Sequence, residues 1–348
     1  MPPLPADDLA LIATHTAPLW NEMRGQRLFL TGGTGFFGVW LTESFLHINR
    51  TFALDAHLTV LTRDPAAFTR KCPHLASYHA LTLLPGDVRT FNHPQGDFAY
   101  IIHAATEASA RQVAEAPLEM LSTILDGTAR ILDFAATHNT RKLLLTSSGA
   151  VYGKQPATLS HIPEDFLGGP DPLDPASVYA EGKRLSEQMC ALHARQSSLQ
   201  IKIARCFAFI GPHLPLDTHF AIGNLLRDAL NNSPIQIAGD GTPLRSYLYA
   251  ADLAIWLWTI LFQAPSMQAI NVGSEEAISI ATLAQTIAAT LNPTLPIHIA
   301  KTPTAETPPS QYVPSTQRAQ QTLSLKPLTT LEESIRRTAA WHTLRTSA

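Results

Sequence analysis

The chain has 348 residues, of which 45% are hydrophobic and 15% charged, and its formal net charge at pH 7 is −3. A chain of this length buries a large core, and its near-neutral charge argues against nucleic acid as a partner. No run of about 18 apolar residues occurs, so we expect no membrane span. Three unpaired cysteines and an N-terminal segment without signal-peptide features predict a cytoplasmic protein. The fourteen histidines form no cluster with ligand spacing, so no metal site is expected.

Apolar runs alternate with helical segments over the first two hundred residues. The expected strands are 27–31, 58–62, 100–103, 142–146 and 201–206, and the helices that accompany them are 36–47, 118–138 and 179–195. A further helix over about 7–20 precedes the first strand. This alternation predicts an α/β fold with a doubly wound parallel sheet of the Rossmann type.

The second half follows this pattern less regularly. Helices are expected at 219–231, 253–263, 280–291 and 331–344. The run 301–315, rich in proline and threonine, is expected to be a loop or a loosely held connection. We therefore predict an N-terminal helical extension (1–24), a dinucleotide-binding domain (25–205) and a smaller C-terminal α/β lobe (206–348). This lobe would hold the substrate, with some of its segments returning to the first domain.

A glycine-rich turn, Thr31–Gly38, connects the first strand to the first helix of the sheet. In such a turn Gly32 allows the tight bend, Gly35 lets the backbone approach a pyrophosphate, and Gly38 lets the helix pack closely on the sheet. The helix N-terminus offers N–H groups to the phosphates. The residues expected at this part of a dinucleotide are Gly32, Thr34, Gly35, Phe36 and Phe37.

Other strand ends supply the remaining cofactor contacts. Arg63, after the second strand, favours binding of the 2′-phosphate of NADP. The neighbouring Asp64 could instead accept the ribose 2′-hydroxyl of NAD, so both cofactors are considered. Asp87 is placed to meet the adenine amino group. The other residues expected at the cofactor are Val88, Ala104, Ala105 and Thr106.

Tyr179 and Lys183 are one helical turn apart and therefore share a helix face. A lysine cation beside a phenol lowers the phenol pKa from about 10, which makes a tyrosinate available as a base. Ser148, at the end of an earlier strand, supplies a hydroxyl as a third member.

These motifs, in this order, resemble those of the extended short-chain dehydrogenases/reductases of the nucleotide-sugar epimerase/dehydratase kind. The TGxxGxxG motif of that family is Thr31–Gly38, its YxxxK is Tyr179 with Lys183, and its serine is Ser148. An arginine-led stretch like the family's begins at Arg245. The resemblance covers roughly residues 25 to 345.

The resemblance implies a mechanism and a set of partners. Tyr179 would take the proton of a sugar hydroxyl while the adjacent carbon gives hydride to the nicotinamide. Lys183 would hold the nicotinamide ribose, and Ser148 would hydrogen-bond the reacting oxygen. The nucleoside-diphosphate sugar would contact Glu107, Ser148, Asn224 and Arg245. A homodimer formed through helices 118–138 and 179–195 is also implied.

Positions 149 and 150 depart from the family pattern. Where 4,6-dehydratases have an acid pair, and glucuronate decarboxylases a glutamate at the second position, this chain has Gly149 and Ala150. Because elimination of water needs an acid and a base, an epimerase or 4-keto reductase is favoured over a 4,6-dehydratase. Arg245, which the resemblance places at a diphosphate, argues against a reductase that acts on steroid-like or flavonoid alcohols. A non-catalytic NAD(P)-binding regulatory protein is the alternative from another class.

Overall fold

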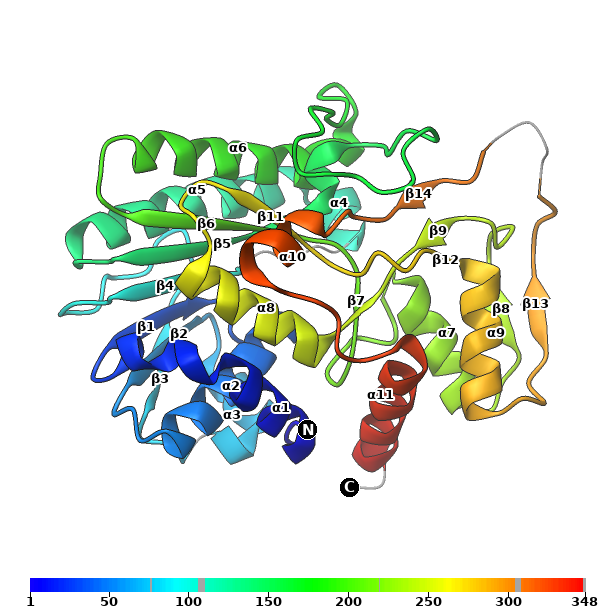
Figure 1. Cartoon of the computed structure of the whole chain (residues 1–348), viewed down its shortest axis with the longest axis horizontal. Coiled ribbons are helices and arrows are strands. Elements are labelled where there is room, and N and C mark those ends of the chain that lie inside the picture. The colour runs from blue at the N-terminus through cyan, green and yellow to red at the C-terminus, as the bar shows by residue number, and fades with distance from the viewer. Residues whose placement is uncertain (76, 106–109, 219, 304–307, 347–348) are drawn as a thin grey trace.

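The computed structural model describes residues 1–348 except 76, 106–109, 219, 304–307 and 347–348 (Figure 1). Its centre is a seven-stranded parallel sheet with the order β11-β6-β5-β4-β1-β2-β3. This order is that of a doubly wound fold, as predicted. The strands are β1 (Arg27–Thr31), β2 (His57–Thr62), β3 (Leu81–Pro85), β4 (Tyr100–His103), β5 (Lys142–Ser148), β6 (Gln200–Cys206) and β11 (Ala269–Val272).

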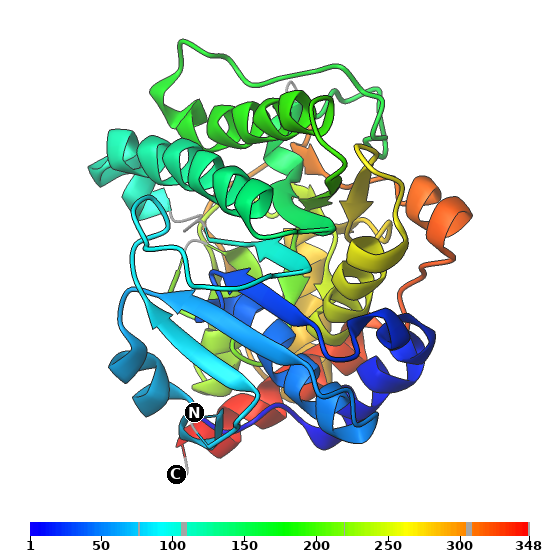
Figure 2. The same cartoon turned by 90° about the vertical axis from the view of Figure 1, so that its left-hand side faces the viewer.

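Helices cover both faces of this sheet (Figure 2). In β1, Leu28 and Leu30 belong to the core cluster formed with α2 (Phe36–Thr51) and α8 (Ala250–Gln263). Phe29 packs with Phe134 of α5 (Pro117–Thr137) on the opposite face. Both faces of the strand are therefore buried, which explains its uninterrupted apolar run. The helices around the sheet are α2 (Phe36–Thr51), α3 (Pro65–Lys71), α4 (Ala110–Glu115), α5 (Pro117–Thr137), α6 (Val178–Ala194) and α8 (Ala250–Gln263).

The N-terminal segment forms α1 (Ala6–Thr16) and a 3-10 helix, Ala17–Met23. Its apolar side chains, including Ile12 and Trp20, are buried in the same cluster as α2 and α8. Asp8 accepts a hydrogen bond from Tyr249 Oη (2.6 Å) and pairs with Arg337 (2.6 Å) of the last helix. Residues 1–23 are therefore part of the main core.

The C-terminal lobe has its own apolar cluster, to which α7, α9 and α11 contribute. Its helices are α7 (Ala221–Leu230), α9 (Ile280–Leu291) and α11 (Leu331–Thr346), whereas α10 (Gln317–Leu323) packs against β11 and α8 of the sheet domain. Its strands are β7 (Phe209–Ile210), β8 (Ile235–Ile237), β9 (Leu244–Arg245), β10 (Leu248–Tyr249), β12 (Ile278–Ser279), β13 (Ile297–Ile299) and β14 (Gln311–Tyr312). Three short 3-10 helices span Pro73–Leu75, Gly149–Tyr152 and Pro175–Ser177. None of the helices placed by the structure is long and apolar enough to cross a membrane.

The prediction of a loop over 301–315 is wrong at its end. Residues 311 and 312 form β14, which pairs in parallel with β9 so that Tyr312 lies opposite Arg245. The sequence did not predict this strand, because two residues in a proline-rich segment are too few to show the alternation of apolar and polar residues that is typical of a strand.

Candidate active site

A cavity of about 1450 Å³ lies at the carboxyl ends of the sheet strands, and the C-terminal lobe forms its far wall. This is where α/β proteins of this kind bind ligands. Every predicted site residue that the structure describes lines it; these are Gly32, Thr34, Gly35, Phe36, Phe37, Arg63, Asp87, Val88, Ala104, Ala105, Ser148, Tyr179, Lys183, Asn224 and Arg245. Thr106 and Glu107 lie outside the described residues.

The glycine-rich turn is packed too tightly for a side chain at the first and third glycines of the motif, Gly32 and Gly38. Gly32 has φ +72°, and a Cβ there would lie 2.4 Å from the carbonyl oxygen of Ala104. A Cβ at Gly38 would lie 2.2 Å from the carbonyl oxygen of Gly32, so α2 can approach β1 only without a side chain at this position. At Gly35 the nearest atom to such a Cβ is 3.5 Å away, which leaves room for a ligand.

The same turn leaves the start of α2 open to the cavity. Gly35 is its N-cap and offers no side chain to the first N–H groups. These N–H groups and the positive end of the helix dipole suit a pyrophosphate. Thr31 Oγ1 accepts the N–H groups of Ala104 and Ala105 (3.1 Å each) and so ties the turn to the end of β4. The residues present therefore fit a dinucleotide.

Two cations, Arg63 and Lys71, line the cavity beyond the end of β2. Arg63 forms no ion pair with any described residue, whereas the Asp64 carboxylate caps α3 by accepting the N–H of Ala67 (2.8 Å). Asp87 is held by Arg89 through two side-chain hydrogen bonds of 2.8 and 2.9 Å, which lower the pKa of its carboxyl to about 2. Lys71 was not among the predicted site residues.

Ser148, Tyr179 and Lys183 come together at the centre of the cavity. Ser148 ends β5, and its Oγ accepts the N–H of Ala150 (3.1 Å). Lys183 Nζ donates to the carbonyl oxygen of Thr146 (2.8 Å) and lies 6.0 Å from the centroid of the Tyr179 ring. Burial lowers the pKa of Lys183 to about 8.

One electrostatic expectation is wrong. Lys183 was expected to bring the pKa of Tyr179 below 10, but burial raises this pKa to about 12, opposed in part by a hydrogen bond with Ser148. Desolvation of the phenolate outweighs the attraction of an ammonium group that is directed at Thr146 instead.

The wall beside Ser148 is aromatic. A Cβ at Gly149 would lie 2.7 Å both from the Phe207 ring and from Tyr312 Oη. Phe207 and Tyr312 pack with their ring centroids 4.6 Å apart. An aspartate or glutamate at position 149 would displace these rings, and Ala150, which lines the cavity, bears no titratable group. Phe207 and Tyr312 were missed by the sequence reasoning because neither belongs to a recognisable motif.

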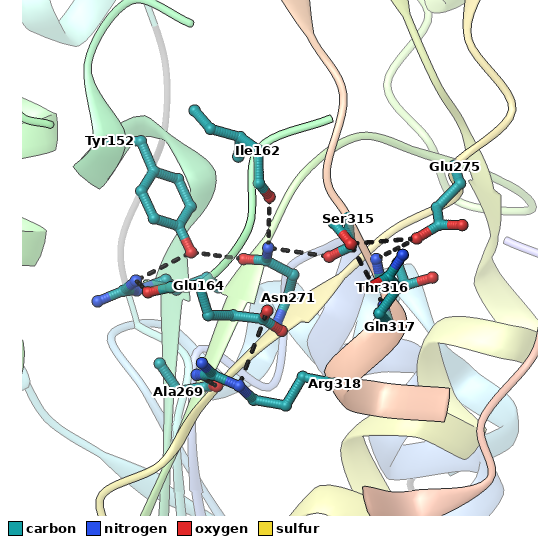
Figure 3. Close-up of polar contacts among 11 residues, drawn as sticks. Tyr152, Ile162, Glu164, Ala269, Asn271, Glu275, Ser315, Thr316, Gln317 and Arg318 are labelled. Carbon is teal, nitrogen blue, oxygen red and sulfur yellow. Dashed lines mark hydrogen bonds and ion pairs between the residues drawn. The ribbon is translucent and has the colours of Figure 1, made fainter. Parts of the chain in front are cut away.

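A series of hydrogen-bonded polar side chains lies behind this wall, within the sheet. Ser147 Oγ donates to Glu187 (2.5 Å), and Glu187 pairs with Arg205 (2.7 Å). Arg205 donates to Tyr152 Oη (2.9 Å), which in turn donates to Asn271 Oδ1 (2.8 Å). Figure 3 shows Tyr152 and Asn271 pointing toward one another. This series connects β5, β6 and β11 immediately behind Ser148.

Arg245 and Asn224 line the cavity from the C-terminal lobe. Arg245 donates to the carbonyl oxygens of Leu244 (2.8 Å) and Ser310 (3.3 Å). Among described residues it forms no ion pair, so a structural salt bridge does not account for it. Asn224 lies in the first turn of α7 and accepts a hydrogen bond from Arg227 (3.3 Å).

Known proteins are similar to this chain in sequence or in fold. The chain is 28% identical to UDP-glucuronic acid decarboxylase 1 of Danio rerio over 319 residues, which cover 91% of this chain and 73% of that protein. Its fold is similar to that of UDP-N-acetylglucosamine 4-epimerase from Methanobrevibacter ruminantium M1, with a TM-score of 0.78 at 21% identity, covering 93% of this chain and 100% of that one. Its fold is also similar to that of UDP-glucuronic acid 4-epimerase from Bacillus cereus, with a TM-score of 0.75 at 21% identity, covering 92% of this chain and 100% of that one.

A family assignment follows from the extent of the sequence match. Residues 28–273 match the NAD dependent epimerase/dehydratase family. This range begins one residue inside β1 and ends just after β11, so it includes the glycine-rich turn, Ser148, Tyr179, Lys183 and Arg245. The chain belongs to the NAD dependent epimerase/dehydratase family.

Proposed function

We propose that the protein is an NAD(P)-dependent enzyme that acts on a nucleoside-diphosphate sugar as an epimerase or a 4-keto reductase. The observation that carries this proposal is the lining of one cavity. Ser148, Tyr179 and Lys183 lie between a dinucleotide-type glycine turn and Arg245, while Gly149 and Ala150 carry no acid. Hydride transfer coupled to proton transfer at one sugar oxygen needs a bound dinucleotide and a proton acceptor, and it needs no acid at positions 149 and 150.

In this mechanism the chain moves one proton and holds one oxygen. Tyr179 accepts the proton of the sugar hydroxyl during oxidation and returns it during reduction. Ser148 hydrogen-bonds the reacting oxygen, and Lys183 holds the ribose beside it. A bound NAD(P) supplies the hydride acceptor and, when oxidised, a positive charge. Such a charge favours the Tyr179 phenolate, which the protein alone disfavours.

We further propose a preference for NADP over NAD. Arg63 and Lys71 offer two cations where the 2′ position of the adenosine ribose would lie. The Asp64 carboxylate, which could otherwise accept a ribose hydroxyl, is engaged at the start of α3. The experiment is to denature the purified protein, identify any nucleotide released, and measure the affinity of the emptied protein for NADP⁺ and NAD⁺.

Arg245 supports the diphosphate part of the substrate. It lies on the cavity wall opposite the glycine turn and has no carboxylate partner among described residues. Arginine binds phosphate oxygens through two parallel hydrogen bonds. Asn224 at the start of α7 would assist it, since helix N-termini attract phosphates.

Decarboxylation of a sugar acid is a second candidate, because relatives such as the Danio rerio protein are decarboxylases. A carboxylate on the carbon next to a newly formed ketone leaves as carbon dioxide, and the enolate that remains takes up a proton at that carbon. This reaction would share its oxidation step with epimerisation. Dehydration is disfavoured by the aromatic wall at Gly149. Elimination needs an acid and a base at the two carbons, and this wall provides neither.

We also propose a homodimer formed through α5 and α6. Leu118 of α5 is 81% exposed, and Leu185 and Leu192 of α6 are also exposed. Exposed leucines on two adjacent helices are suited to a four-helix contact with a second copy. Sedimentation of the wild-type protein and of a Leu192→Glu variant tests this contact.

The reaction is tested with a panel of UDP-, dTDP-, GDP- and CDP-sugars that includes UDP-glucuronate. Epimers or 4-hydroxy products support the proposal, a pentose with carbon dioxide indicates decarboxylation, and a 4-keto-6-deoxy product contradicts it. Tyr179→Phe should lower turnover by about 10²–10⁴-fold and still bind the dinucleotide. Tyr78→Phe, outside the cavity, is the control. Dinucleotide binding without turnover of any sugar would favour the regulatory alternative.

A further inference from the structure

His103 ends β4 at the point where the glycine-rich turn meets this strand. The parallel pairing of β1 with β4 places Thr31 opposite His103, and Nδ1 of the histidine lies 2.8 Å from Thr31 Oγ1. The histidine side chain is buried and takes no part in the proposed hydride and proton transfers. Its contacts therefore call for a separate explanation.

The hydrogen bonds of Thr31 fix the direction of this contact. A threonine hydroxyl has one proton to donate and two lone pairs that accept. The N–H groups of Ala104 and Ala105 both donate to Thr31 Oγ1 (3.1 Å each), and the first is shared with the carbonyl oxygen of Thr31 (3.3 Å). Because an N–H group can only donate, these two occupy both lone pairs, and the hydroxyl proton is left for His103. Nδ1 of His103 is therefore an acceptor and carries no proton.

The other side of the ring agrees with this assignment. A neutral histidine that accepts at Nδ1 carries its proton at Nε2, and burial lowers the pKa of His103 to about 3, which keeps the ring neutral. Nε2 faces Thr128 Oγ1 of α5 at 3.4 Å, a long contact. Thr128 donates its own proton to the carbonyl oxygen of Ile124 (2.7 Å), so its oxygen can accept from Nε2–H and from the hydroxyl of Ser186 (2.9 Å). Each group in this series then has a partner for its proton.

The contact between Thr31 and His103 holds a wall of the dinucleotide cavity in place. Gly32, Ala104 and Ala105 all line this cavity. A Cβ at Gly32 would lie 2.4 Å from the carbonyl oxygen of Ala104 and 2.8 Å from the nitrogen of Ala105, so the turn and the strand end are in close contact. Without an acceptor at Nδ1, the Thr31 proton would turn elsewhere and one of the two N–H groups would lose its lone pair. The turn would then be free to separate from the end of β4.

We propose that His103 is a positioning residue for dinucleotide binding: its unprotonated Nδ1 accepts the Thr31 hydroxyl proton and so keeps the glycine-rich turn joined to the end of β4. The inference rests on the proposed function only in that a dinucleotide binds at this turn. When a protein populates other arrangements, its affinity for a ligand falls by the fraction of molecules that remain competent to bind. Loss of the acceptor should therefore weaken cofactor binding in addition to any effect on stability.

Two amide substitutions separate the two ring nitrogens. The amide of His103→Asn lies about where Nδ1 lies and can accept from Thr31, whereas that of His103→Gln reaches the position of Nε2 and leaves Thr31 without its acceptor. Nucleotide-free protein is titrated calorimetrically with whichever of NADP⁺ and NAD⁺ the wild type binds more tightly. The affinity should fall at least about tenfold in His103→Gln and stay within about threefold of wild type in His103→Asn. A loss in His103→Gln no greater than that in His103→Asn overturns the inference.

A double-mutant cycle shows whether His103 acts through Thr31. Thr31→Val keeps the shape of the side chain and removes the hydroxyl, so in this background His103→Gln should cause no further loss of affinity. Additive losses overturn the inference. Thr128→Val is the matched control, because it removes the group that faces Nε2. It should lower the free energy of unfolding and leave the dinucleotide affinity unchanged; a loss equal to that of His103→Gln would assign the effect to general destabilisation and also overturn the inference.

The position of the ring proton is measured directly by NMR. In protein labelled with ¹⁵N at its fourteen histidines, the ring signals absent from His103→Asn identify His103, and the nitrogen chemical shifts distinguish protonated from unprotonated ring nitrogens. We expect an unprotonated Nδ1 and a protonated Nε2 at neutral pH, both in the empty protein and with dinucleotide bound. A proton on Nδ1 overturns the inference, and this measurement decides if His103→Gln does not fold.

None of these measurements needs a sugar, so they separate the inference from the proposed function. If the variants and the ring proton behave as expected while wild type turns over no sugar, the proposed reaction is wrong and the positioning role stands. If wild type turns over a sugar and His103→Gln binds the dinucleotide as tightly as His103→Asn, only the inference fails. In an active enzyme, His103→Gln should raise KM for an exchangeable dinucleotide at least about tenfold with little change in kcat.

Discussion

Asn271→Ala removes the residue that joins the sheet to the segment carrying Tyr312. Asn271 is fully buried in β11, and its amide makes three side-chain hydrogen bonds of 2.8 to 3.0 Å. Alanine fills part of the space and makes none of them. We expect the folded protein to be destabilised well beyond the effect of the lost volume.

The magnitude follows from the groups left without partners. Tyr152 Oη loses the acceptor for its proton, and the carbonyl oxygen of Ser315 loses its donor. The carbonyl oxygen of Ile162 keeps the N–H of Ser315 (2.9 Å). An unsatisfied buried group costs about 1–3 kcal/mol. The Tyr152 hydroxyl is such a group, whereas the Ser315 carbonyl is only partly buried and adds a smaller loss.

Urea unfolding followed by circular dichroism measures this loss. Asn231→Ala, which truncates an exposed asparagine at the end of α7, is the matched control and should change the free energy of unfolding by less than about 0.5 kcal/mol. A loss below about 1 kcal/mol for Asn271→Ala would refute the reasoning, because it would show that the orphaned groups find water or other partners at no cost.

Three further predictions concern the dinucleotide side of the cavity. Gly38→Ala places a Cβ 2.2 Å from the carbonyl oxygen of Gly32 and should therefore disturb the turn. In a calorimetric titration the affinity for NADP⁺ should fall at least about tenfold, which is a loss of about 1.4 kcal/mol. An unchanged affinity would contradict the packing argument. Arg63→Ala should lower the affinity for NADP⁺ at least about tenfold and leave the affinity for NAD⁺ unchanged, since a hydrogen bond to a charged group contributes about 1.5–3 kcal/mol. An equal loss of affinity for both dinucleotides would count against the contact with the 2′-phosphate. Burial lowers the pKa of His103 to about 3, so the unfolded chain binds a proton that the folded chain does not, and stability should fall as pH falls from 6.5 toward 3. His103→Asn, which can keep the contact with Thr31, should reduce the dependence of the free energy of unfolding on pH, measured by urea unfolding at several pH values. If this dependence is unchanged, it arises from another titrating group.

The dinucleotide half of the site could be predicted because its chemistry is local in sequence. The turn from Gly32 to Gly38 needs glycines at fixed spacings, and the helical spacing of Tyr179 and Lys183 places both on one face. The sheet was predictable for a related reason. Strands buried on both faces are continuous apolar runs, and β1, β4 and β5 lie where those runs are.

The remainder depended on contacts between distant segments. Tyr312 lines the cavity because β14 pairs with β9 and because Asn271 holds Ser315, and no local pattern encodes either contact. The effect of Lys183 on Tyr179 was misjudged for a similar reason. Spacing gives their proximity, whereas the depth of burial that dominates the pKa arises only from the assembled fold.

The pairing of Asp8 with Arg337 joins residues 329 positions apart and so affects the order of folding during synthesis. Residues 1–23 are synthesised long before α8, whose Trp258 packs on Trp20, and before α11, which carries Arg337. Until α8 has been made, Ile12, Trp20 and their neighbours would therefore lack part of the surface that buries them in the finished protein. Contacts of such long range slow folding and prolong the exposure of apolar surface. The nascent chain should thus depend on chaperones that shield its first helix until α8 has been synthesised.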